Sequence, residues 1–154
     1  MALNSRDKGK RGEREIIDAL QPHVDEVADF AGVDRLKLQR NTLQSDKGGY
    51  DIVGLPGFAL EVKRVENAIP SAVWGWWEQA VRQAKNGEEP VLLWRVNGGK
   101  WHVRVFTRLD LPDGKRYKIP SDIQFTDFVF WMKAKLFGHL MEKKKALDGT
   151  PMAS

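Results

Sequence analysis

The sequence has no cysteine in its 154 residues, only three histidines, and no apolar run long enough to cross a membrane. Without cysteine the chain forms no disulfide, offers no thiol nucleophile and binds no zinc through thiolates. A membrane-spanning helix needs about 20 apolar residues, so we expect no membrane partner. The start of the chain also lacks the apolar segment of a signal peptide.

The few histidines and the glycine pair carry no site either. No two histidines have the spacing of metal ligands, and no phosphate-binding loop signature surrounds Gly98-Gly99. We interpret Gly98-Gly99 as a turn and assign no histidine to catalysis. The sequence therefore predicts neither a histidine metal centre nor a small-molecule cofactor.

What the chain does contain is apolar material and positive charge. Hydrophobic residues make up 42% of the sequence, which is enough for a core, and the length suits a single domain over residues 1–154 with fraying expected at 1–5 and 143–154. The net charge of +4 permits a polyanionic partner without requiring one. One cluster of positive residues lies near the start of the chain: Lys8, Lys10, Arg11 and Arg14.

The segment from Tyr50 to Lys63 predicts a β-hairpin, because two short apolar runs flank a Pro-Gly turn signal. Side chains alternate along a strand, so Glu61 and Lys63 share one face. If the connecting loop holds an odd number of residues, Asp51 lies opposite Glu61, with about 5 Å between their Cβ atoms. A shift of one residue moves Asp51 to the other face. In the first register, either a hard divalent cation or Lys63 alone has to offset the repulsion of two carboxylates.

The other elements alternate between helix and strand patterns, which indicates an α/β protein. A helix is expected over residues 6–20 and a second helical piece over 23–30, because Pro22 ends or bends the helix. In chain order we then expect a strand over 35–40, a loop over 41–49, the hairpin, a helix over 71–85, strands over 91–97 and 101–107, a loop over 110–120, and a helix over 126–140.

Glu13 stands out on the first predicted helix. It lies on the side of the apolar stripe, and a carboxylate on a buried side needs a partner. Glu15 is expected to face solvent. Gly9 and Gly12 each cost up to about 1 kcal/mol in a helix, so we expect another backbone to come close to them.

The chain begins with a predicted helix that carries Glu13. A hairpin with Asp51 and Glu61-x-Lys63 follows, and then a helix and strands. This order of elements and residues resembles the PD-(D/E)xK nuclease superfamily. Segments 8–15, 49–53 and 60–63 look most like the archaeal-type Holliday-junction resolvases and their viral relatives. Tyr50 stands where the superfamily usually has proline. The resemblance implies a restriction-endonuclease-like core, which is a small mixed β-sheet flanked by helices. It also implies a place in the cytoplasm of a bacterium, an archaeon or a virus-infected cell.

The resemblance further implies metal-dependent hydrolysis of phosphodiester bonds. Glu13, Asp51, Glu61 and the backbone carbonyl of Val62 would hold one or two Mg²⁺ ions, for which Mn²⁺ can substitute. Lys63 would orient or deprotonate the attacking water and offset developing charge. The alternative interpretation is a buried cluster of salt bridges that holds no metal.

Further candidates follow from position. Gln79 and Gln83 share one helix face, and some superfamily members place a glutamine of this helix near the metal; the alternative is a solvated polar face. The loop after residue 40 resembles a resolvase segment that contacts DNA, although an ordinary polar loop is the alternative. The residues expected to contact DNA are Lys8, Lys10, Arg11, Arg14, Arg40, Ser45 and Lys47.

The resemblance thus predicts a Mg²⁺-dependent, structure-specific DNA endonuclease of the resolvase kind, with a role in DNA recombination or repair. Its partner would be branched DNA, and it would act as a homodimer, since two cuts across a four-way junction need two active sites. One alternative is another nuclease of the superfamily, with nicking, restriction-like or end-processing activity. The other is a catalytically silent nucleic-acid-binding protein of the same fold.

Overall fold

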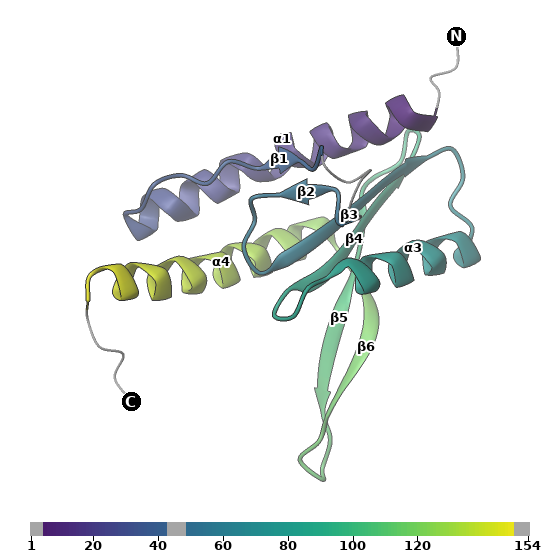
Figure 1. The fold of residues 1–154 in the computed structure, drawn as a ribbon. Helices are drawn as coiled ribbons and strands as arrows, with labels where there is room; N and C mark the ends of the chain where they lie inside the picture. Colours follow the sequence, from purple (N-terminus) through teal and green to yellow (C-terminus); the bar gives the residue numbers. More distant parts are fainter. Residues whose placement is uncertain (1–4, 43–48, 150–154) are drawn as a thin grey trace.

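The computed structural model describes residues 5–42 and 49–149. Over these residues the chain forms one mixed sheet of six strands in the order β1-β2-β3-β4-β5-β6 (Figure 1). Only β3 and β4 are parallel, and the other neighbouring pairs are antiparallel. The strands are β1 (Gln39–Arg40), β2 (Ile52–Val53), β3 (Phe58–Val65), β4 (Glu89–Val96), β5 (His102–Asp110) and β6 (Arg116–Ile123).

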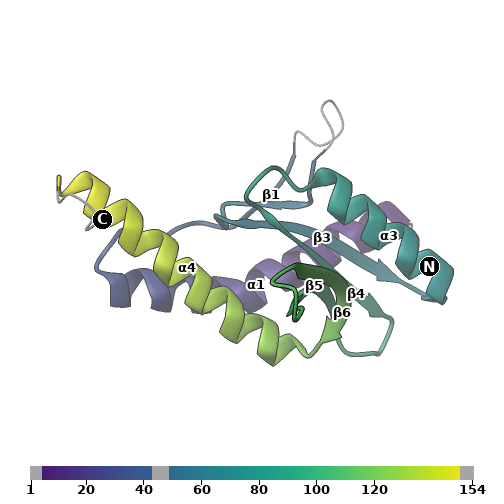
Figure 2. The same cartoon turned by 90° about the horizontal axis from the view of Figure 1, so that it is seen from below.

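Helices cover both faces of this sheet. Helices α1 (Ser5–Ala31) and α4 (Phe125–Leu147) enclose the larger core on one face, and α3 (Pro70–Gln83) packs on the other face over a smaller cluster (Figures 1 and 2). The predicted α/β class, with a small mixed sheet flanked by helices, is therefore confirmed. None of the helices in the described ranges combines the length and apolarity that a bilayer crossing requires.

Helix α1 does not end at Pro22, as the sequence suggested it might. It continues from Ser5 to Ala31 through the proline. Leu20 and Val24 are fully buried on either side of the proline, while Pro22 itself is exposed. The carbonyl that loses its helical hydrogen bond therefore faces water, and burial of the two flanking side chains offsets the cost.

The predicted loop over residues 110–120 is wrong. Strand β6 begins at Arg116, pairs with β5 along its whole length, and follows a short turn at Gly114. Pro120 weakened the strand signal in the sequence. However, β6 is an edge strand, and an edge position tolerates the missing N–H of proline. The strand expected over 35–40 is also shorter, since β1 covers only Gln39–Arg40. Helix α4 reaches Leu147, so residues 143–147 are helical where fraying was expected.

The register between β2 and β3 positions the predicted site. Ile52 pairs with Leu60, so one residue further along the hairpin Asp51 lies beside Glu61. This is the register that an odd loop requires. Gly54 in the connecting loop has φ of +102°, and a Cβ there would collide with the Lys37 carbonyl. Only glycine lets the chain before β1 run this close to the hairpin.

Candidate active site

Glu61 forms the centre of the candidate site. Its side chain is completely buried, and neither carboxylate oxygen has a hydrogen-bond partner in the described part of the chain. Burial, and after it the neighbouring Asp51 carboxylate, raise the pKa of Glu61 to about 7, while Lys63 acts in the opposite direction. An ionised carboxylate in this position is expensive unless a positive charge joins it.

Asp51 reaches the same place from the start of β2. It is 6% exposed, and its Oδ2 accepts a hydrogen bond of 2.7 Å from the backbone N–H of Val62. A second bond of 2.9 Å runs from the N–H of Asp51 to the carbonyl of Leu60. These bonds hold the carboxylate against β3, which explains why a strand of only two residues suffices to place it.

Lys63 is the positive charge beside the two acids. Its Nζ lies 3.1 Å from Glu61 Oε1. The contact is an ion pair without hydrogen-bond geometry, which is why Glu61 still lacks a hydrogen-bond partner. Lys63 side-chain exposure is 28%, so its ammonium lies where the buried acids meet solvent.

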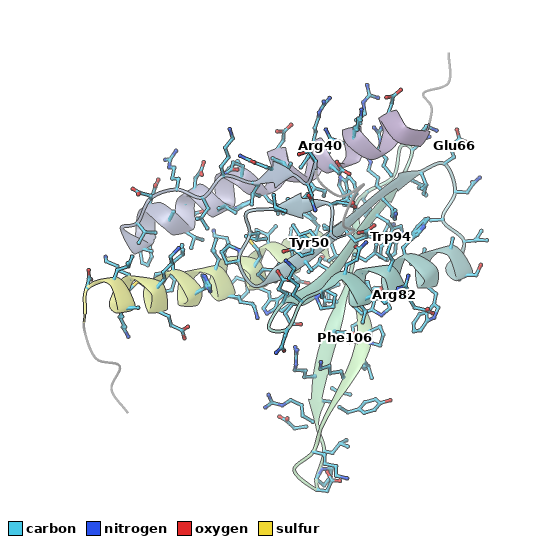
Figure 3. All side chains as sticks on the ribbon, viewed as in Figure 1. Arg40, Tyr50, Glu66, Arg82, Trp94 and Phe106 are labelled. Atoms are coloured by element: carbon cyan, nitrogen blue, oxygen red, sulfur yellow. The ribbon has the colours of Figure 1, made fainter. Side chains whose placement is uncertain are left out.

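Glu13 approaches from α1, as the sequence analysis expected, and its partner is Arg40. Arg40 Nε donates a 2.6 Å hydrogen bond to Glu13 Oε2; Figure 3 shows Arg40 beside α1. Burial raises the pKa of Glu13, the Arg40 bond lowers it, and the charge of Asp51 raises it again. The charge of Asp51 therefore acts on Glu13, but the carboxylate of Glu13 is held in its ion pair with Arg40.

The donor set suits a hard divalent cation, although not all of it is aimed at one point. Across residues 5–42 and 49–149, no group of three or more His, Asp or Glu is assembled to hold a metal ion. Asp51 and Glu61 are adjacent, whereas Glu13 is bound to Arg40. The buried oxygens of Glu61 without hydrogen-bond partners are the feature that fits a cation with oxygen ligands.

The basic start of α1 separates into two kinds of residue. Lys8 forms a 2.7 Å ion pair with Glu66 of the segment after β3. Arg11 and Arg14 are exposed and Lys10 is partly exposed, and these three make no ion pair with any described residue. Ser45 and Lys47 lie outside the described residues.

Gly12 and Glu15 are the residues that explain how α1 packs against the sheet. A Cβ on Gly12 would lie 3.0 Å from Arg64 Cβ, so side chains of the sheet, and not the expected backbone, come close there, and no described atom lies within 4 Å of a Cβ on Gly9. The expectation that Glu15 faces solvent is wrong. Its carboxylate bridges Arg64 at 3.2 Å and Arg95 at 2.8 Å. The sequence hid this role because the partners lie on β3 and β4.

One of the two α3 glutamines lies at a cleft beside Tyr50. Gln83 lines it, and its Oε1 is buried without a hydrogen-bond partner among the described residues. Gln79 is half-buried. Tyr50 lines the same cleft and donates a 2.8 Å hydrogen bond to Glu88. Sequence reasoning missed Arg82, which also lines this cleft (Figure 3); its position at the end of a helix beside Gln83 was the available signal.

Comparison with known proteins identifies a family. The family model described as "Phage putative PDDEXK endonuclease" matches residues 4–135, which includes Glu13, Asp51, Glu61 and Lys63. No curated protein and no solved structure matches the chain.

Proposed function

The chain belongs to the phage PD-(D/E)xK endonuclease family, and from this premise we propose that it is a Mg²⁺-dependent, structure-specific DNA endonuclease of the resolvase kind. The observation that supports this most strongly is the Glu61 carboxylate, which is fully buried with no hydrogen-bond partner among the described residues and lies beside Asp51 and Lys63. Structural salt-bridge clusters usually satisfy their buried carboxylates with hydrogen bonds, whereas Glu61 has the ion pair with Lys63 and no hydrogen bond among the described residues.

The ligand set that we propose consists of Asp51, Glu61 and the backbone carbonyl of Val62, with Glu13 as an additional carboxylate. A divalent cation bound by these oxygens supplies positive charge that polarises the phosphate and makes a water molecule nucleophilic near neutral pH. The acids would contribute the oxygen ligands. Buried like charges without a cation would repel one another, which favours cation binding.

Lys63 holds the second positive charge of the site. Its Nζ lies 3.1 Å from Glu61, at the partly exposed edge of the acidic pair. We assign it to contact with the scissile phosphate and to orientation of the attacking water. A cation in this position stabilises the charge that grows on the phosphate oxygens as the bond to the leaving oxygen breaks.

Arg40 and Glu13 form the adjustable part of the proposed site. Their 2.6 Å pair occupies the Glu13 carboxylate in the absence of DNA. A phosphate is an equally good partner for a guanidinium. If DNA took Arg40 as its partner, the carboxylate of Glu13 would be free to join Asp51 and Glu61 as a further ligand of the cation. Gln83, with its buried Oε1, is an accessory polar group at the edge of the same site.

Branched DNA and a homodimer complete the proposal. A four-way junction is resolved by two cuts related by a two-fold axis, and a symmetric dimer supplies two sites with that relation. The basic residues Lys10, Arg11 and Arg14 on α1 would contact phosphates near Glu13. The alternatives are a nicking, restriction-like or end-processing nuclease, and a silent binding protein.

One assay separates these functions. Synthetic four-way junction, flap, nicked and linear DNAs that share one sequence are incubated with Mg²⁺, and products are sized at nucleotide resolution. Asp51→Asn, which keeps the shape of the side chain, is the matched control. Paired symmetric cuts in the junction alone support the proposal. Equal cutting of linear duplex identifies another superfamily nuclease. DNA binding without any Asp51-dependent cutting identifies a silent binder.

A further inference from the structure

The far halves of β5 and β6 form a two-stranded ribbon that projects from the body of the protein (Figure 1). Val103 and Val105 at the start of β5 are buried in the core, whereas residues 108–118 are all exposed. We call residues 107–119 the ribbon. Nothing in the core explains its length, because the strands continue several residues beyond their last buried side chains.

The ribbon has one charged face and one uncharged face. Arg108 pairs with Lys118 and Asp110 with Arg116, whereas the intervening pairs are uncharged. Phe106 identifies the charged face, because its ring packs on Trp77 of α3 with centroids 4.9 Å apart and Lys118 Nζ lies 5.4 Å above it (Figure 3). The charged face is therefore the α3 face of the sheet.

The two candidate catalytic residues of β3 face the same way. Glu61 pairs with Leu92 and Lys63 with Trp94 across β3 and β4, and both Leu92 and Trp94 belong to the cluster under α3. Paired residues on neighbouring strands point to one face. Helix α3 covers part of this face, so a polyanion bound at Glu61 and Lys63 that continues beyond α3 on this side meets the charged face of the ribbon.

Three cations on the ribbon are available to such a polyanion. Lys115 and Lys118 have no carboxylate partner among the described residues. Arg116 is paired with Asp110 at 2.8 Å, but their side chains are 65% and 77% exposed, and such a surface pair is weak enough to exchange. Arg108 differs, because its 2.6 Å pair with the shielded Glu89 fastens the base of the ribbon to β4.

We propose that the ribbon is an arm that holds the DNA duplex flanking the cut, through contacts of Lys115, Arg116 and Lys118 with phosphates. The proposal rests on the proposed nuclease function and deepens it. A two-stranded β-ribbon also has the dimensions of the DNA major groove, so the arm can follow the duplex without a change in its own fold.

The register gives the reach of the arm. Leu92 pairs with both Glu61 and Arg104, so these residues lie side by side across three strands. Asp110, which lies opposite Arg116, is about 20 Å further along β5 than Arg104, at roughly 3.3 Å per residue. Three strand spacings of about 4.8 Å separate β3 from β6. Together these give about 25 Å from Glu61 to Arg116, and the same reckoning gives about 20 Å to Lys118 opposite Arg108, or roughly 6 to 7 base pairs at about 3.4 Å each. Phosphates much nearer to the cut are out of reach of the arm.

The test uses the full chain and two DNAs. One is a four-way junction with arms of about 15 base pairs, and the other has arms of about 5 base pairs closed by hairpin loops, which ends before the calculated reach. Binding is measured by fluorescence anisotropy over a salt titration. The arm variant is Lys115→Ala/Arg116→Ala/Lys118→Ala. The matched control, Lys100→Ala/Lys143→Ala/Lys145→Ala, removes the same formal charge elsewhere.

We expect the arm variant to bind the long junction at least tenfold more weakly, with a log-log salt slope lower by about 2 to 3. It should match the wild type on the short junction, and a Lys115→Arg/Lys118→Arg variant should keep wild-type affinity. The control should lose less on the long junction than the arm variant. Circular dichroism and thermal melts establish that each variant is folded.

Several outcomes overturn the proposal. An arm variant with wild-type affinity, an equal loss in the control, or an equal loss on both junctions would each exclude a specific arm. If Tyr117→Asp halves the mass in light scattering, the ribbon is an interface between copies. If the wild type neither binds nor cuts any DNA, the proposed nuclease function itself is wrong. If the wild type cuts DNA normally and the arm variant is unaffected, only the proposed arm is wrong.

Discussion

Replacement of Glu61 by glutamine should make the metal-free protein more stable at neutral and alkaline pH, although it removes a proposed catalytic group. The two side chains have nearly the same shape, but glutamine has no proton to lose. Burial and the nearby Asp51 raise the pKa of Glu61 from 4.5 to about 7. The wild type therefore carries the cost of a buried negative charge that the variant lacks.

The size and sign of this effect follow from proton linkage. Below pH 4.5 Glu61 is protonated in both the folded and the unfolded chain, and it imposes no cost. Between 4.5 and about 7 only the unfolded chain ionises, so the folded state loses stability as pH rises. Above 7 the full cost applies, and at about 1.4 kcal/mol per pKa unit it amounts to about 3 kcal/mol. Lys63 loses its partner in the variant, but its ammonium is open to water.

The measurement is urea unfolding of the wild type and of Glu61→Gln in EDTA, at about pH 4 and about pH 8, where the ionisation states differ most. The variant should be more stable by up to about 3 kcal/mol at the higher pH and equal at the lower. Mg²⁺ at 100 times its dissociation constant should then stabilise the wild type by about 2.7 kcal/mol and leave the variant unchanged. A variant that is less stable at about pH 8 would refute this account of the buried carboxylate.

Three further outcomes are expected. Ca²⁺ in place of Mg²⁺ should sustain DNA binding with little or no cleavage on denaturing gels, because its looser coordination misplaces the reacting groups; cutting at the Mg²⁺ rate would contradict the proposed chemistry. Arg40→Ala should tighten Mg²⁺ binding by the free protein in calorimetry, since Glu13 is released, while DNA cleavage falls; unchanged Mg²⁺ affinity would show that Glu13 is not a ligand. Lys10→Ala/Arg11→Ala should lower the salt slope of DNA binding by about 2 and weaken junction and duplex binding alike; an unchanged slope in salt titrations would place the DNA elsewhere.

Local patterns were sufficient for the elements that carry the site. The alternation in Phe58–Val65 and the Pro-Gly turn predicted a hairpin with Asp51 opposite Glu61 in one of two registers, and the pairing of Ile52 with Leu60 shows that this is the register formed. Both signals are properties of neighbouring residues, since strand alternation and turn geometry need no distant partner. The parallel pairing of β3 with β4 was not predicted, because it depends on the crossover through α3.

The ribbon and the continuous first helix were decided by tertiary context. Pro120 lowers the local strand signal, yet β6 forms because its partner β5 is already anchored in the sheet and its own outer edge needs no N–H. Pro22 is tolerated because burial on both sides of it holds α1 in one piece. Strand pairing in the first case, and packing in the second, outweighs a local preference, and sequence windows register neither.

The residues of the candidate site show the same division between local sequence pattern and tertiary structure. The sequence by itself determined which residues form the acidic pair and its lysine, because a two-residue spacing on one strand and the register of one hairpin place them together. Only the tertiary structure decided that Glu61 is sealed from water, that Glu13 is held by Arg40, and that Glu15 bridges β3 and β4. Burial and ion pairs between distant segments depend on how helices cover the sheet, and no spacing within a single element encodes that arrangement.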